Sequence, residues 1–135
     1  MKYIFLIFVL LPILVFSQNE IAIDIYKVPS SKGKISVAVY NKKEGFLKFD
    51  QVFKSDSIVA QKGITHIAIT NIPQGEYALA IFHDENGNDK LDTNWLGIPK
   101  EKVAFSHAKM KPFGPPAYKD CAFKVERDTK ITISL

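Results

Sequence analysis

Short runs in which apolar and polar residues alternate constrain the fold of this 135-residue chain more than any other feature. Successive side chains of a β-strand point to opposite faces, so alternation indicates a strand with one buried face. The runs are residues 20–28, 34–41, 64–69, 77–82, 118–126 and 129–135. Glycine, proline and small polar residues separate them, and no long segment has the apolar period of a helix. We therefore expect an all-β protein built from short strands.

Six or seven such strands predict an antiparallel β-sandwich of immunoglobulin-like or transthyretin-like topology, with about seven strands. The additional strand is a short run within residues 57–61. The turn at 29–33 predicts that the first two strands form a hairpin, and the turn from Pro73 to Gly75 is typical of a second hairpin. The run 77–82 is apolar on both faces, which indicates a central strand.

The first 17 residues have the composition of a secretory signal peptide. Lys2 precedes an apolar run at 3–16, and Ser17 is a small residue at the expected cleavage point. This run is shorter than the ~20 residues that a membrane-spanning helix needs, and it contains Pro12, so an uncleaved anchor is the less favoured alternative. We assign 1–17 to a signal peptide and 18–135 to a single domain that is secreted to the periplasm or the cell exterior.

Charge and cysteine content argue against several classes of protein. The net charge of +4 is mild and the basic residues are scattered, so no nucleic-acid partner is expected. The single cysteine, Cys121, excludes an internal disulfide. Because Cys121 alternates with Phe123 and Val125, we interpret it as a buried apolar thiol rather than a nucleophile.

The densest polar segment is HDENGNDKLD at 83–92, directly after the predicted central strand. Its polar residues recur at alternate positions, as they do in calcium loops, where side chains and one backbone carbonyl surround the ion. Gly87 permits the left-handed backbone that such a curled loop requires. The expected ligands are Asp84, Asn86, Asn88, Lys90 through its backbone carbonyl, and Asp92.

The segment nevertheless departs from the calcium site of a helix–loop–helix protein. Asp89 stands where that loop has glycine, and Trp95 stands where it has a bidentate glutamate. Glu101 follows a turn at 97–99 and is expected to fold back as the missing carboxylate. The prediction is a weak calcium site, with a dissociation constant of about 10⁻⁴–10⁻³ M as in extracellular modules. The alternative is a solvated turn whose Asn and Asp side chains bind only the backbone.

Two further groups of residues are candidates for function. The candidates to line an apolar ligand pocket are Phe46, Phe49, Phe53 and Trp95. For the three phenylalanines, the favoured interpretation is nevertheless that they cap one end of the core. A hydrolase or zinc site would use Ser106 with His83 or His107, but the spacings typical of such sites are missing. We therefore expect no catalytic residue.

Several segments resemble a family of small secreted bacterial proteins catalogued as domain of unknown function 2141. The matching segments are Lys32-Gly33-Lys34-Ile35 with the strand at 37–41, Pro73-Gln74-Gly75-Glu76-Tyr77, HDENGNDKLDTNWLGIPKE at 83–101 with Phe105-Ser106, and residues 116–123. Asp89 and residues 102–104 differ from the family pattern, where a glycine is usual. The resemblance implies secretion and a β-sandwich, and it implies no particular activity.

Together these features predict a secreted, non-enzymatic β-sandwich that calcium stabilises and that acts as a binding or accessory module of the cell envelope. The alternative is a small-molecule carrier with an apolar pocket, and a hydrolase is less favoured. We expect an envelope or extracellular partner of unknown identity, no membrane insertion after signal cleavage, and a monomer.

Overall fold

The computed structural model describes residues 18–135 and is nearly all β. Its strands are β1 (Asn19–Val28), β2 (Lys34–Tyr40), β3 (Lys54–Val59), β4 (Gly63–Ile72), β5 (Gly75–Asp84), β6 (Val103–Phe105), β7 (Phe123–Val125) and β8 (Thr129–Ser134). The helical elements are single turns, η1 (Phe49–Gln51) and α1 (Tyr118–Cys121). The signal peptide predicted at 1–17 lies outside the described residues. Among residues 18–135, no helix has the length and apolar character needed to cross a membrane.

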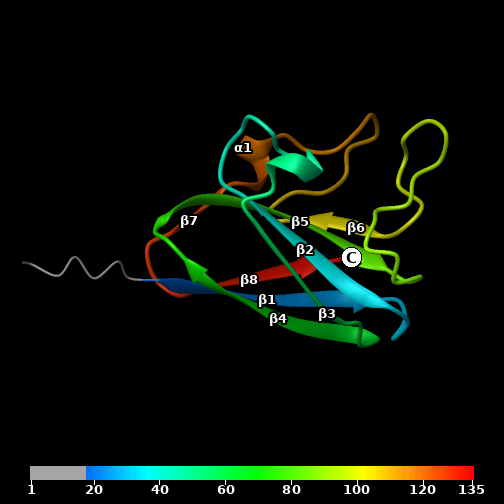
Figure 1. Ribbon diagram of the computed structural model, residues 1–135, viewed down its shortest axis with the longest axis horizontal. Coiled ribbons are helices and arrows are strands. Elements are labelled where there is room, and N and C mark those ends of the chain that lie inside the picture. Colours follow the sequence, from blue (N-terminus) through cyan, green and yellow to red (C-terminus); the bar gives the residue numbers. More distant parts are fainter. Residues whose placement is uncertain (1–17) are drawn as a thin grey trace, which may run out of the picture.

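The strands form two sheets that enclose a common core (Figure 1). One sheet has the order β4-β1-β8, and the other has the order β3-β2-β5-β6 with β7 also paired to β5. All pairings are antiparallel except that between β1 and β8, which is parallel. The prediction of a mainly antiparallel β-sandwich is confirmed.

Both predicted hairpins are wrong. β1 pairs with β4 and β8, whereas β2 pairs with β3 and β5, so the turn at 29–33 carries the chain from one sheet to the other. The turn between β4 and β5 also crosses between the sheets. A crossing turn and a hairpin turn leave the same alternation in the flanking strands, so turn composition does not identify the pairing partner.

Alternation identified the inward-facing side chains. Ile21, Ile23 and Ile25 of β1 are fully buried, and they pack with Leu79 and Ile81 of β5 in the main core. β5 is central, as predicted, because it lies between β2 and β6 and also pairs with β7. The strand that leads into the polar segment therefore has more pairing partners than any other described strand of its sheet.

The five-stranded sheet carries a second apolar layer on its outer face. Tyr40, Ala78, Phe105, Tyr118 and Cys121 are buried there beneath the loops around η1 and α1. The prediction of one strand at 118–126 is therefore wrong, because this segment forms a helical turn followed by β7. Its cysteine is fully buried, which confirms the interpretation of an apolar thiol.

Candidate functional site

A loop at residues 85–101 rises from the end of β5 and returns to β6 (Figure 1). Its two arms are joined by backbone bonds from Lys100 N to Asp92 O at 2.8 Å and from Asn94 N to Ile98 O at 2.9 Å. The loop thus has a polar base, formed by the Asp/Asn segment, and an apolar tip around Trp95 and Leu96. We call residues 84–92 the polar turn and residues 93–99 the apolar tip.

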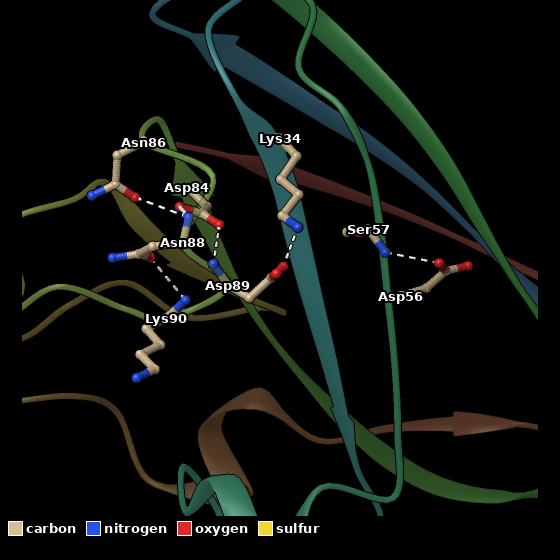
Figure 2. A network of polar contacts seen from close by, with 8 residues as sticks. All are labelled: Lys34, Asp56, Ser57, Asp84, Asn86, Asn88, Asp89 and Lys90. Carbon is tan, nitrogen blue, oxygen red and sulfur yellow. Dashed lines mark hydrogen bonds and ion pairs between the residues drawn. The ribbon is translucent and has the colours of Figure 1, made fainter.

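Asp84 organises the polar turn (Figure 2). Its side chain is fully buried, and its two carboxylate oxygens accept hydrogen bonds from Asn88 N at 3.2 Å and Asp89 N at 2.9 Å. Gly87 and Asp89 have positive φ angles of 68° and 65°, which curl the chain around this carboxylate. The polar turn is therefore built around a buried negative charge that backbone N–H groups hold in place.

Asp92 closes the polar turn from the other arm of the loop. Its carboxylate accepts hydrogen bonds from the Asn86 amide at 2.6 Å and the Asn88 amide at 3.0 Å. The backbone N–H of Lys90 donates to the Asn88 amide oxygen at 3.0 Å, and the Lys90 side chain extends away from the turn (Figure 2). Asp84, Asn86, Asn88, Lys90 and Asp92 thus belong to one hydrogen-bonded unit.

Glu101 folds back onto this unit, and its Oε2 accepts a hydrogen bond from Asp92 N at 3.1 Å. Burial raises the pKa of Glu101, and the charges of Asp92 and Asp84 raise it further. The folded state therefore disfavours ionised Glu101. The stability that protonated Glu101 contributes is fully present below the ordinary pKa of 4.5. This stability is lost as pH rises through the raised pKa of the folded state.

The donor set of the polar turn fits a hard cation, because it consists of carboxylate, amide and carbonyl oxygens. As the side chains stand, hydrogen bonds within the turn occupy the carboxylate and amide oxygens. Within the described residues, no three His, Cys, Asp or Glu side chains form a group arranged to hold a metal. An ion would therefore have to replace the bonds that the Asn86 and Asn88 amides make to Asp92.

Lys34 on β2 neutralises part of the negative charge at the loop base. Its ammonium group pairs with the Asp89 carboxylate, which raises the pKa of Lys34 (Figure 2). On the opposite face of β5, the buried His83 bonds through Nε2 to the carbonyl of Lys32 at 2.7 Å. The turn at 29–33 is therefore tied to the end of β5, and His83 has a structural role in this contact.

An apolar groove of about 680 Å³ opens on the outer face of the five-stranded sheet. Its floor is formed by side chains of β2, β5 and β6, including Ala38 and Ala80, which are paired directly across the strands. Its walls are Leu91 with residues 96–99, residues 110–115, and Leu47 with Phe49. Tyr40 and Lys111 are the lining residues whose side chains carry a nitrogen or oxygen atom.

Of the four candidates for an apolar pocket, Phe49 lines the groove, whereas Phe46, Phe53 and Trp95 lie outside its lining. Phe46 packs its ring against Tyr40 and Tyr118, at centroid distances of 5.2 and 5.6 Å, and so caps the outer apolar layer. Phe53 packs against Tyr77. Trp95 lies at the apolar tip with 90% of its surface exposed. The wall residues at 96–99 and 110–115 were not among the four named candidates, although large apolar residues among glycines and prolines in these segments were a usable signal.

The surroundings of Ser106 also differ from those of a catalytic nucleophile. It is fully buried, its hydroxyl donates to Cys121 O at 2.6 Å, and Leu79 N donates to that hydroxyl at 2.9 Å. His107 is exposed and packs its ring against Phe123. The Ser106 hydroxyl is thus bonded to backbone groups and not to a histidine.

One family model, described as an uncharacterized protein conserved in bacteria (DUF2141), matches residues 23–133. The chain belongs to this family. No curated protein and no solved structure matches it. The matched region extends from β1 to β8, so the polar turn and the groove both lie within the DUF2141 domain.

Proposed function

We propose that this DUF2141 protein is an exported, non-enzymatic binding module whose apolar groove takes its ligand and whose groove wall is braced by calcium. The observation that carries the proposal is the continuity of the two sites in one loop. The polar turn forms the base of the loop, and residues 96–99 of its apolar tip form a wall of the groove. Order at the base therefore sets the position of the wall.

Charge at the loop base supports a role for calcium. Asp84, Asp92 and Glu101 lie close enough for the first two to raise the pKa of the third. Calcium takes about 6–8 oxygen ligands, and these three carboxylates would supply the charge that balances it. Asn86 and Asn88 would contribute amide oxygens, and Lys90 its carbonyl. Bound calcium would neutralise the repulsion and link both arms of the loop.

The shape and lining of the groove support an apolar ligand. Its volume of about 680 Å³ lies within the range of roughly 300–1,000 Å³ that is typical of small-molecule sites. The lining is almost entirely aliphatic, aromatic and proline side chains. Apolar contacts would provide the affinity, and Tyr40 and Lys111 are positioned to bind one polar group of the ligand. Binding of an apolar ligand in this way is the function expected of a small-molecule carrier.

The two candidate nucleophiles support a non-enzymatic role. Ser106 and Cys121 are both fully buried, and the Ser106 hydroxyl donates to the Cys121 carbonyl. Burial raises the pKa of the Cys121 thiol to about 11, so the reactive thiolate is scarce at neutral pH. Export is supported by the composition of residues 1–17.

We expect the purified domain, residues 18–135, to bind the apolar fluorescent probe N-phenyl-1-naphthylamine at the groove. Ala80→Phe fills the floor and is expected to weaken binding by about tenfold or more, since about 1.4 kcal/mol of lost contact corresponds to tenfold. The matched control is Ala68→Phe, which adds the same side chain at an exposed position on the other sheet. Equal probe affinity in the wild type and Ala80→Phe would rule out the groove as the binding site.

A further inference from the structure

The rim of the groove carries large apolar side chains that extend beyond it. Phe113 has a relative exposure of 104%, as high as in an isolated residue, and Trp95 reaches 90%. Phe49, Leu96 and Ile98 are also exposed. Figure 1 shows the three segments that bear them gathered on the same side of the molecule, over the outer face of the five-stranded sheet. We call these five side chains the apolar rim.

A ligand inside the groove leaves the outermost part of this rim in water. Trp95 lies outside the groove lining, and the full exposure of Phe113 means that no other residue of the described part, 18–135, covers it. Soluble monomers rarely expose contiguous apolar surface of this kind unless another surface covers it. Tryptophan and phenylalanine at loop tips match the head-group region of a lipid bilayer, where amphipathic and aromatic side chains concentrate.

Charge around the rim selects the kind of surface. Eight exposed charged residues lie within two positions of a groove-lining apolar residue. Two are carboxylates, Asp50 and Asp89, and six are lysines, Lys48, Lys90, Lys100, Lys102, Lys109 and Lys111. Lys111 lines the groove itself, and its Nζ forms an ion pair with Asp120 Oδ2 at 2.9 Å. No carboxylate is among the lining residues. Lysines beside exposed apolar side chains provide the two contributions, electrostatic and hydrophobic, that peripheral binding to anionic lipid requires.

We propose that the apolar rim docks on an anionic phospholipid surface, with Trp95, Leu96 and Phe113 entering the head-group region and the lysines contacting phosphate groups. Docking in this manner turns the mouth of the groove toward the lipid. Docking itself requires the apolar rim alone. The docking proposal rests on the proposed function only for the statement that the groove meets its ligand at the lipid surface. Loop tips at a surface differ from a spanning anchor, which none of the described helices can form.

Trp95 is the only tryptophan of the chain, so its emission reports directly on the rim. Vesicles of phosphatidylcholine with about 30% phosphatidylglycerol are expected to shift this emission to the blue and to co-sediment with the domain. Pure phosphatidylcholine vesicles, or high salt, are expected to give much weaker binding. Phe113→Ser is expected to weaken vesicle binding by about tenfold or more, and Lys100→Ala with Lys109→Ala by a similar factor.

The matched control is Val59→Ser, which removes an apolar side chain that is 71% exposed on β3, away from the rim. It is expected to bind vesicles as the wild type does. Absence of vesicle binding, or equal binding by Phe113→Ser and the wild type, would overturn the docking proposal. Self-association that Phe113→Ser abolishes, without vesicle binding, would overturn it in favour of a second copy of the chain. Probe binding that survives the loss of vesicle binding would leave the proposed groove function standing.

Discussion

Gly33→Ala is expected to lower the free energy of unfolding by more than about 3 kcal/mol, enough to leave much of the domain unfolded. Gly33 has a φ of +63° at the end of the turn that crosses between the sheets. A Cβ at this position would lie 2.0 Å from the carbonyl oxygen of Asp84 and 2.8 Å from the backbone of Glu85. Since these atoms belong to the backbone, β5 would have to move away from the turn. Urea denaturation followed by circular dichroism measures the loss.

Gly87→Ala is the matched control for this prediction. Gly87 has a similar φ of +68°, but no atom of residues 18–135 lies within 4 Å of a Cβ added to it. The control therefore has the backbone strain without the collision, and about 1–2 kcal/mol is expected. If Gly33→Ala and Gly87→Ala lost the same stability, the close contact between the turn at 29–33 and the base of the polar turn would be wrong.

Ser106→Ala is expected to lower the free energy of unfolding by about 2–4 kcal/mol. The Ser106 hydroxyl satisfies two buried backbone groups at once, the N–H of Leu79 and the carbonyl of Cys121. Alanine would leave both groups without a partner, and each unsatisfied buried group costs about 1–3 kcal/mol. The hydroxyl therefore joins β5 to the end of α1, on the face of the sheet that bears the groove.

Urea denaturation of Ser106→Ala, compared with that of Ser57→Ala, separates the effect of the two unsatisfied backbone groups from the effect of removing a serine hydroxyl in general. Ser57 lies exposed on β3, and a change within about 0.5 kcal/mol is expected there. A Ser106→Ala variant as stable as Ser57→Ala would show that water or a neighbouring residue replaces both bonds.

The strands could be predicted from the sequence because burial imposes a period of two on them. Ile21, Ile23 and Ile25 must face the core together, and any shift by one residue would expose all three. Strand pairing could not be predicted, since Gly33 and its turn serve equally well for a hairpin or a crossing between sheets. The helical turn at Tyr118–Cys121 was also missed, because its two buried residues are compatible with an extended run of apolar positions.

The polar turn could be located because its residues are close in sequence and spaced by a local rule. The approach of Glu101 to the turn could be predicted as well, since the turn at 97–99 leaves few places for it. The groove could not be predicted, because three segments distant in sequence form its walls. Phe46 and Phe53 have the same residue type as Phe49, and only tertiary packing determines which of them faces the groove.

Thermal unfolding of the wild type and Glu101→Gln, each in calcium and in chelator at pH 7, tests most directly whether calcium braces this loop. In chelator we expect Glu101→Gln to melt higher than the wild type. The glutamine removes a charge that the fold disfavours, and its oxygen can still accept the bond from Asp92 N. This difference should shrink as pH falls toward 4.5, where glutamate takes up its proton.

In about 10 mM calcium the Tm of the wild type is expected to rise by about 5 °C or more, as follows from the expected affinity. The Tm of Glu101→Gln should rise much less, because the variant lacks one of the three carboxylates. The Tm difference between Glu101→Gln and the wild type that is expected in chelator should therefore shrink or change sign in calcium. A wild-type Tm that is the same in calcium and in chelator would contradict the calcium-braced loop.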